Sequence, residues 1–349
     1  MNAWTLITLV SRCWLVAGFL AVRGAAHDGP EDEVGELTEL IEKGETPELL
    51  VRRAIEYRVM GKNTEASHDL ERATRMNPAS LFAQRELGRV YFALGKTNEA
   101  IDTLSHALKI KGEEPTEIAS LRILRAEFYR ARSENKKALE DSEEAIRLHP
   151  QNVEWYLLRS DLQERLKLPK ERIKGIENGV RETGAGILEI ELVEAFLDDK
   201  QYETALIKIE QELKDSRIQG SWLLRRARAK MGQGDKKAAT LDLEAALEEI
   251  NPRLTAGSVD ASLLTDKAQA HDLLGEKIEA RRYYEQARDA GADEWVKERI
   301  KAIKAEEDAR EKEKEKVLDK ERGLVDEDKP DKPEKESKAE RKQKAKDKL

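Results

Sequence analysis

Small, aromatic and apolar residues recur along the early part of the chain at a fixed offset of 34 residues. The matching pairs between residues 47 and 112 are Ala54 and Gly88, Tyr57 and Tyr91, Gly61 and Gly95, Ala66 and Ala100, Leu70 and Leu104, and Ala73 and Ala107. Six landmarks at one offset rarely arise by chance. Such a period indicates a chain that is built from repeated structural units.

Each unit is predicted to be a pair of antiparallel helices, because neither helix could bury its apolar face alone. The small residue of the first helix, Ala54 or Gly88, and the two alanines of the second are predicted where the helices cross closely. A bulky side chain at such a fitted position typically costs about 1–3 kcal/mol. Gly61 and Gly95 are expected to end the first helix, where a left-handed backbone is least costly for glycine.

This order of landmarks resembles the tetratricopeptide repeat, in which a small residue, a tyrosine, a glycine and two alanines recur in a helix–turn–helix unit. The second copy carries the fuller signature, with Leu87, Gly88, Tyr91, Gly95, Ala100, Leu104 and Ala107. The resemblance implies an all-α fold: a right-handed superhelical α-solenoid of antiparallel helix-turn-helix hairpins, with a terminal capping helix and a disordered charged tail. It covers residues 47–292.

About seven repeats fit this range, and the fourth and fifth are degenerate. The third repeat restarts four residues late and has Ser142 where a large apolar residue is expected. In the fourth, Arg172 and Gly179 replace two alanines. The fifth follows the break at residues 184–186, and the sixth and seventh regain the pattern.

Two helices are predicted to flank the repeats. Residues 27–46 form a linker with a short amphipathic helix, which either caps the first repeat or remains a frayed linker helix. The C-terminal helix, residues 293–322, places Trp295, Val296 and Ile300 on one stripe that fits the last hairpin. Residues 323–349 have too few apolar side chains to order themselves, so we expect a disordered charged tail. That tail either keeps the chain soluble or docks on an acidic surface or an anionic lipid.

The first 26 residues differ from the rest of the chain. An apolar run of about ten residues, from Cys13 to Val22, follows Arg12, and the small residues Gly24, Ala25 and Ala26 come soon after it. This pattern is typical of a signal peptide, and the run is short for a membrane span. We therefore expect residues 1–26 to be a signal peptide and the protein to be secreted, periplasmic or otherwise in the cell envelope. An uncleaved membrane anchor and a misplaced start are the alternatives. Removal of this segment would take away Cys13, the one cysteine of the chain.

The charge balance argues against a general nucleic-acid binder. The chain has 63 Lys and Arg and 71 Asp and Glu, which gives a net charge of −8 spread over both signs. Aromatic residues make up only 5% of the sequence, and helix-forming residues are abundant, in keeping with an all-α chain.

No motif for catalysis or for binding a cofactor is present in the sequence. The five histidines are scattered over the linker and different repeats, and no two have the spacing of metal ligands. A nucleophile elbow, a phosphate-binding glycine loop and an HExxH motif are all missing. We therefore expect a protein that is not an enzyme and binds neither a metal, a cofactor nor a small-molecule substrate.

The resemblance implies instead that the first helix of each repeat lines a concave groove, where such proteins bind extended peptides or partner helices. The candidate residues in that groove are Arg85, Arg89, Phe92, Arg130, Leu157, Leu224 and Arg228. The first four are expected to receive an acidic or C-terminal segment of a partner, unless Glu127 neutralises Arg89 or Arg130 internally. A Lys and Asn set that holds a terminal carboxylate in some relatives is missing, because Val51 and Ile55 stand there.

The sequence thus predicts an exported, non-catalytic scaffold that binds a partner protein or peptide in its groove. The alternative is an accessory subunit that organises an envelope or secreted enzyme complex. Contact with a membrane is expected only through an uncleaved N-terminus.

Overall fold

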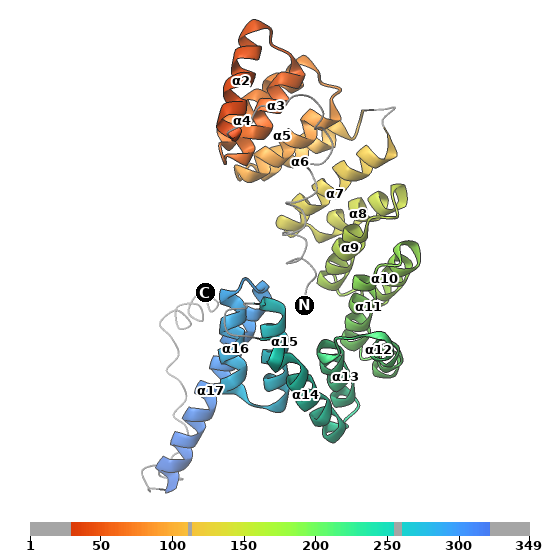
Figure 1. The fold of residues 1–349 in the computed structure, drawn as a ribbon, viewed down its shortest axis with the longest axis vertical. Helices are drawn as coiled ribbons and strands as arrows, with labels where there is room; N and C mark the ends of the chain where they lie inside the picture. The colour runs from red at the N-terminus through yellow and green to blue at the C-terminus, as the bar shows by residue number, and fades with distance from the viewer. Residues whose placement is uncertain (1–28, 111–113, 255–259, 322–349) are drawn as a thin grey trace, which may run out of the picture. The chain divides into compact units, whose positions relative to one another are not determined.

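The computed structural model describes residues 29–110, 114–254 and 260–321. Helices joined by short turns make up this part of the chain, and no strand occurs in it (Figure 1). The predicted signal peptide at residues 1–26 and the predicted tail at residues 323–349 lie outside the described residues. The chain divides into two compact units, residues 1–256 and residues 257–349.

The first unit contains one leading helix and six consecutive helical hairpins. Helix α2 (Pro30–Lys43) leads, and a short 3-10 helix (Asn251–Arg253) closes the series. The hairpins are α3 (Pro47–Val59) with α4 (Asn63–Met76), α5 (Leu81–Ala93) with α6 (Thr97–Ala107), α7 (Pro115–Ala131) with α8 (Asn135–Leu148), α9 (Val153–Arg165) with α10 (Pro169–Thr183), α11 (Gly186–Asp198) with α12 (Tyr202–Asp215), and α13 (Gly220–Gly232) with α14 (Lys236–Ile250). Helix α2 lies against α3 and buries Leu37.

The second unit contains a hairpin of α15 (Ala261–Leu274) and α16 (Lys277–Asp289), followed by the long helix α17 (Glu294–Glu321). The first part of α17 buries Val296, Ile300 and Ile303 and packs against α16. Arg299 also donates hydrogen bonds to both carboxylate oxygens of Asp272 on α15, at 2.5 and 2.7 Å. The rest of α17 extends beyond the hairpin (Figure 1). The predicted fold class, an all-α solenoid of antiparallel hairpins with a terminal capping helix, is confirmed.

The first helix of every hairpin in the described chain ends in the same left-handed turn. Gly61 and Gly95 have φ of 74° and 75°, as predicted for helix-ending glycines. The third, fourth and fifth hairpins place non-glycine residues there, at Ser133, Lys167 and Lys200, with φ between 57° and 61°. A left-handed backbone at such residues costs about 1 kcal/mol or more. The turn geometry therefore persists where the glycine is lost.

The small residues at the helix crossings are fully buried. Ala54, Ala66, Ala100 and Ala107 have no exposed surface. A Cβ atom added to Gly88 would lie 3.1 Å from Cδ2 of Leu104 and 3.6 Å from the carbonyl oxygen of Ala100. Helices α5 and α6 thus approach each other closely because both carry a small residue at the contact.

Ala100→Leu is expected to lower the free energy of unfolding by about 1–3 kcal/mol, because the crossing has no room for the added side chain. Gly88→Leu is expected to cost less, since it also gains about 1 kcal/mol of helix propensity. Chemical denaturation followed by far-UV circular dichroism measures both. Ala93→Leu, at an exposed position of α5, serves as the control. If Ala100→Leu unfolds at the same denaturant concentration as the wild type, α5 and α6 do not cross where we place the contact.

Candidate functional site

The predicted groove residues lie on the first helices of their hairpins. We call the surface formed by these first helices, α3, α5, α7, α9, α11 and α13, the groove surface. Arg85, Arg89 and Phe92 project from α5 and Arg130 from α7, while Leu157 lies on α9 and Leu224 and Arg228 lie on α13.

Three arginines of α3 and α5 share a single carboxylate. The side chain of Glu86 is 9% exposed, and its oxygens lie 3.5 Å from Nε of Arg58, 3.7 Å from Nε of Arg85 and 3.6 Å from Nε of Arg89. These distances are long for charge-assisted hydrogen bonds, which usually span 2.7–2.9 Å. One carboxylate therefore neutralises three guanidinium groups only in part.

Several polar atoms of this arginine cluster (Arg58, Arg85 and Arg89 around Glu86) are buried without a hydrogen-bond partner among the described residues. They are Nε of Arg58, Nε of Arg85 and Oε2 of Glu86. Loss of solvent around Arg85 lowers the pKa of its guanidinium, although the nearby Glu86 acts in the opposite direction. The positive charge of Arg85 is thus less compensated than that of an ordinary surface arginine.

An apolar cavity of about 660 Å³ opens beside the arginine cluster. Helix α3 and the start of α5 enclose it, and its lining residues are Pro47, Glu48, Val51, Arg52, Ile55, Asn77, Ser80 and Phe82. Phe82 is 44% exposed, which is unusual for so large an apolar side chain. The guanidinium of Arg85 lies 5.0 Å from the centre of the Phe82 ring, so the cavity and the arginine cluster adjoin.

Phe92 and Arg130 are partly engaged within the groove surface itself. The ring of Phe92 stacks on that of Phe128, with centroids 4.4 Å apart and planes inclined by 12°. Nη1 of Arg130 donates a 3.4 Å hydrogen bond to Asp161 on α9. Burial raises the pKa of Glu127, while Arg89 and Arg130 act to lower it.

The remaining predicted groove residues are taken up by internal contacts. Leu157 and Leu224 are buried, with 4% and 2% of their surface exposed, and they offer no face to a partner. Arg228 donates a 2.6 Å hydrogen bond to Glu194 on α11. The structure therefore brings Arg85, Arg89 and Phe92 together on one open surface and leaves Leu157, Leu224 and Arg228 away from it.

Arg58, Glu86 and the cavity residues Val51, Ile55 and Phe82 were not among the predicted site residues. Arg58 lies at the position of the first repeat that corresponds, by the 34-residue offset, to Phe92. The register that selected Phe92 would therefore have found Arg58. The same offset relates Val51 and Ile55 to Arg85 and Arg89, so the register also marks two of the cavity residues. Phe82 and the cavity as a whole have no such signal, because they depend on the placement of α3 relative to α5.

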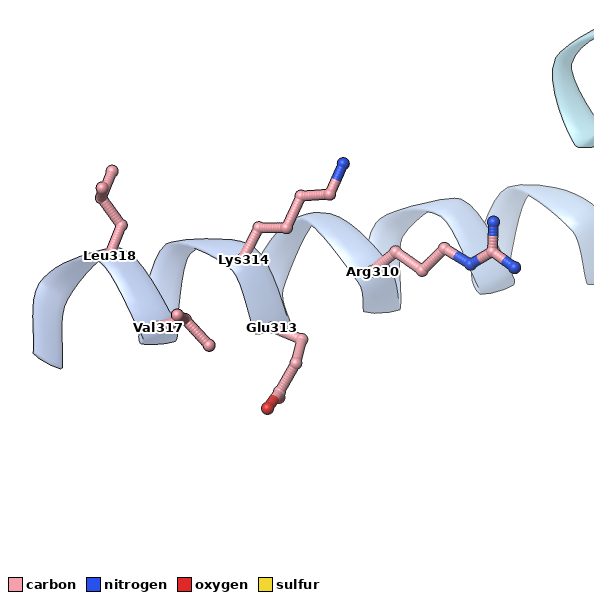
Figure 2. A pocket seen from close by; sticks show the side chains of 5 residues that line it. All are labelled: Arg310, Glu313, Lys314, Val317 and Leu318. Atoms are coloured by element: carbon pink, nitrogen blue, oxygen red, sulfur yellow. The ribbon is translucent and has the colours of Figure 1, made fainter. Parts of the chain in front are cut away.

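A second depression, of about 380 Å³, lies on the extended part of α17. Its lining residues are Arg310, Glu313, Lys314, Val317 and Leu318. Figure 2 shows these side chains projecting in different directions from a single helix, and every lining residue belongs to α17. They do not enclose a binding site.

None of the helices in the described residues combines the length and the apolar character needed to cross a membrane. No group of three or more His, Cys, Asp or Glu side chains in the same residues is arranged to hold a metal ion.

Residues 51–115 match the family model of the tetratricopeptide repeat. The crystal structure of a tetratricopeptide repeat protein from Parabacteroides merdae is similar to this chain, with a TM-score of 0.54 and 18% sequence identity over 74% of this chain and 99% of that one. Residues 51–115 of this chain thus carry tetratricopeptide repeats, and the repeat fold extends over the rest of the described hairpins. The C-terminal part of a repeat protein of the same kind from Cytophaga hutchinsonii is also similar, with a TM-score of 0.50 and 15% identity over 71% of this chain and 98% of that one. None of the curated proteins matches the chain.

Tetratricopeptide repeat proteins generally act as non-catalytic scaffolds for interactions between proteins. The match to the family model spans the first two hairpins, which also carry the arginine cluster and the apolar cavity. The surface of α3 and α5, within the region that matches the tetratricopeptide repeat, is therefore the candidate functional site.

Proposed function

We propose that the protein is an exported, non-catalytic scaffold that binds a partner protein or peptide on the groove surface of α3 and α5. One observation carries the choice of surface: the under-neutralised arginine cluster lies beside an open apolar cavity. An arginine group next to an apolar pocket is a common composition of binding hot spots.

The rest of the groove surface in the first unit is less suited to this role, because its charges pair with one another. Asp161 accepts hydrogen bonds from Arg130 and Arg165, and Glu194 accepts them from Arg225 and Arg228. A charged ligand would have to break such pairs before it could bind. On the surface of α3 and α5, a ligand would have the fewest such ion pairs to break.

Export is the second part of the proposal and depends on residues 1–26. Their apolar run after Arg12, followed by Gly24, Ala25 and Ala26, has the composition of a cleavable signal peptide. The accessory subunit of an envelope or secreted enzyme complex is a narrower form of the same scaffold role.

Site-specific photocrosslinking in native cells tests the proposal. A photoreactive amino acid at Phe82 is expected to give a discrete adduct with a partner protein. The same amino acid at Ile207, which is 65% exposed on the second helix of another hairpin, is expected to give none. Adducts from Ile207 but not from Phe82 would place the binding surface elsewhere.

The intact mass of the same purified protein reports on export. We expect a mature chain that begins near His27 and is recovered outside the cytoplasm. A cytoplasmic chain that begins at Met1 would contradict export. A single enzyme that crosslinks in stoichiometric amounts would identify the scaffold as an accessory subunit.

A further inference from the structure

We infer that the surface of α3 and α5 recognises a partner segment in which one large apolar side chain lies within a few residues of two carboxylates. This inference rests on the proposed function and specifies the chemistry of the ligand. It follows from what the arginine cluster and the cavity each lack.

The arginine cluster lacks anionic hydrogen-bond acceptors. Three guanidinium groups surround the single carboxylate of Glu86, and none of them comes within 3.4 Å of it. Glu117 and Glu127 act on Arg85 and Arg89 only from a longer range, with no ion pair between them in the described part of the chain. The cluster therefore retains an excess of about two positive charges.

Carboxylates satisfy this deficit better than neutral acceptors do. A guanidinium offers five N–H donors in a planar fork and binds a carboxylate through two parallel hydrogen bonds. Arg89 is 43% exposed and Arg58 is 37% exposed, so both can reach a ligand. Arg85 is more enclosed, at 24%, and its pKa is already lowered by loss of solvent, so an added anion would relieve it. A basic segment would meet repulsion at the same place.

The cavity lacks an apolar occupant. Val51, Ile55 and the exposed Phe82 ring present apolar surface to a volume of about 660 Å³, which admits a side chain as large as leucine or phenylalanine. Enclosing such a side chain removes apolar surface of both molecules from water, which favours binding.

The spacing between the two features fixes the pattern of the ligand. Arg85 stacks on Phe82 at 5.0 Å, so the guanidinium groups begin where the cavity wall ends. An extended peptide advances about 3.3 Å per residue. The apolar side chain and the carboxylates must therefore lie within a few residues of each other, and the partner segment is acidic with an apolar anchor.

Selection from a displayed library of random twelve-residue peptides on the full-length chain tests the inference. The enriched peptides are expected to share Leu, Ile, Met, Phe or Trp within four residues of two Asp or Glu. The affinity of the best peptide is then measured by fluorescence anisotropy at low and high salt. Screening should weaken the binding of such a peptide as the salt concentration rises.

Two variants separate the parts of the site. Arg85→Gln with Arg89→Gln is expected to raise the Kd at least tenfold at low salt and to flatten its salt dependence. Phe82→Ala is expected to raise the Kd at least fivefold and to leave the salt dependence unchanged. The control, Arg147→Gln with Arg181→Gln, removes the same number of positive charges at two exposed arginines outside the site. It should bind the peptide as the wild type does. Far-UV spectra of all variants report whether the fold is retained.

Enriched peptides without carboxylates would overturn the inference, as would binding that the Arg85 and Arg89 changes leave intact. Self-association of the chain that the same changes abolish would assign the surface to a second copy and overturn it as well. In each case a crosslink from Phe82 to a partner in cells would still support the scaffold function. The inference and the proposed function therefore fail separately.

Discussion

Arg172→Ala is expected to lower the free energy of unfolding of the region around α9, α10 and α11 by about 3 kcal/mol, because it leaves a buried carboxylate without its cation. The side chain of Arg172 is 6% exposed and that of Glu191 is 13% exposed. Arg172 donates hydrogen bonds to Ser160 at 3.0 Å, to Glu191 at 2.9 Å and to Asp198 at 2.8 Å. It thereby joins three consecutive helices.

Burial alone would lower the pKa of Arg172, but the carboxylates of Glu191 and Asp198 outweigh burial and raise it. In a repeat array each unit contacts only its neighbours, so the loss should stay local. Hydrogen exchange of peptides from α9 to α11 measures it, alongside denaturant unfolding. Arg165→Ala, which removes an exposed partner of Asp161, is the control and should cost less than about 1 kcal/mol.

A double variant distinguishes an ion pair from simple packing. Arg172→Met with Glu191→Gln removes both charges while it keeps similar volumes, so it should recover much of the stability that Arg172→Ala loses. If Arg172→Ala alone exchanges and unfolds as the wild type does, the charge network does not hold these helices together.

The repeat register made most of the fold predictable, including parts where the consensus residues are lost. Ala54, Gly88, Ala66 and Ala100 identify the helix crossings, and the structure buries all four. Local sequence is enough to predict these crossings, because the two helices of a hairpin pack mainly on each other and on the neighbouring hairpin.

The fourth repeat looks degenerate in sequence because its core is built differently. Arg172 stands where other repeats have alanine, and the small, buried Ser160 opposite leaves room for its guanidinium. A Cβ on Gly179 would lie 2.7 Å from Cδ1 of Tyr156, so the tyrosine ring takes the space of the missing methyl group. Such exchanges involve two or three residues at once, which a comparison of single positions does not detect.

The candidate site was only partly predictable. Arg85 and Arg89 follow from the register, since they face outward from the first helix of the second hairpin. The apolar cavity and the sharing of Glu86 by three arginines depend on how α3 and α5 are set side by side. Leu157 and Leu224 lie at the register position of Arg85 on α9 and α13 but are buried, so the register alone does not tell an exposed position from a buried one.

Glu194→Gln is expected to remove about 3 kcal/mol of stability at pH 7, and the difference from the wild type is expected to vanish in acid. Glu194 accepts hydrogen bonds from Nε of Arg225 at 2.8 Å and from Nη1 of Arg228 at 2.6 Å. Burial alone would raise the pKa of this carboxyl group, but the two guanidinium groups, Arg228 first, outweigh burial and hold the pKa well below its ordinary value of 4.5.

The sign of the pH dependence follows from this depressed pKa. The ionised carboxylate stabilises the folded chain in full above the pKa of the unfolded state, near 4.5, and its contribution is lost as the pH falls from there through the lower pKa of the folded state. Denaturant unfolding of the wild type and of Glu194→Gln between pH 7 and pH 3 measures the difference between their free energies of unfolding. Because both proteins share all the other carboxylates, the titration of those groups cancels in this difference. Glu203→Gln, at an exposed position of α12, should give the same pH profile as the wild type. A difference for Glu194→Gln that stays constant across this range would mean that the pair with Arg225 and Arg228 does not hold the carboxyl group ionised, and that its loss acts through packing alone.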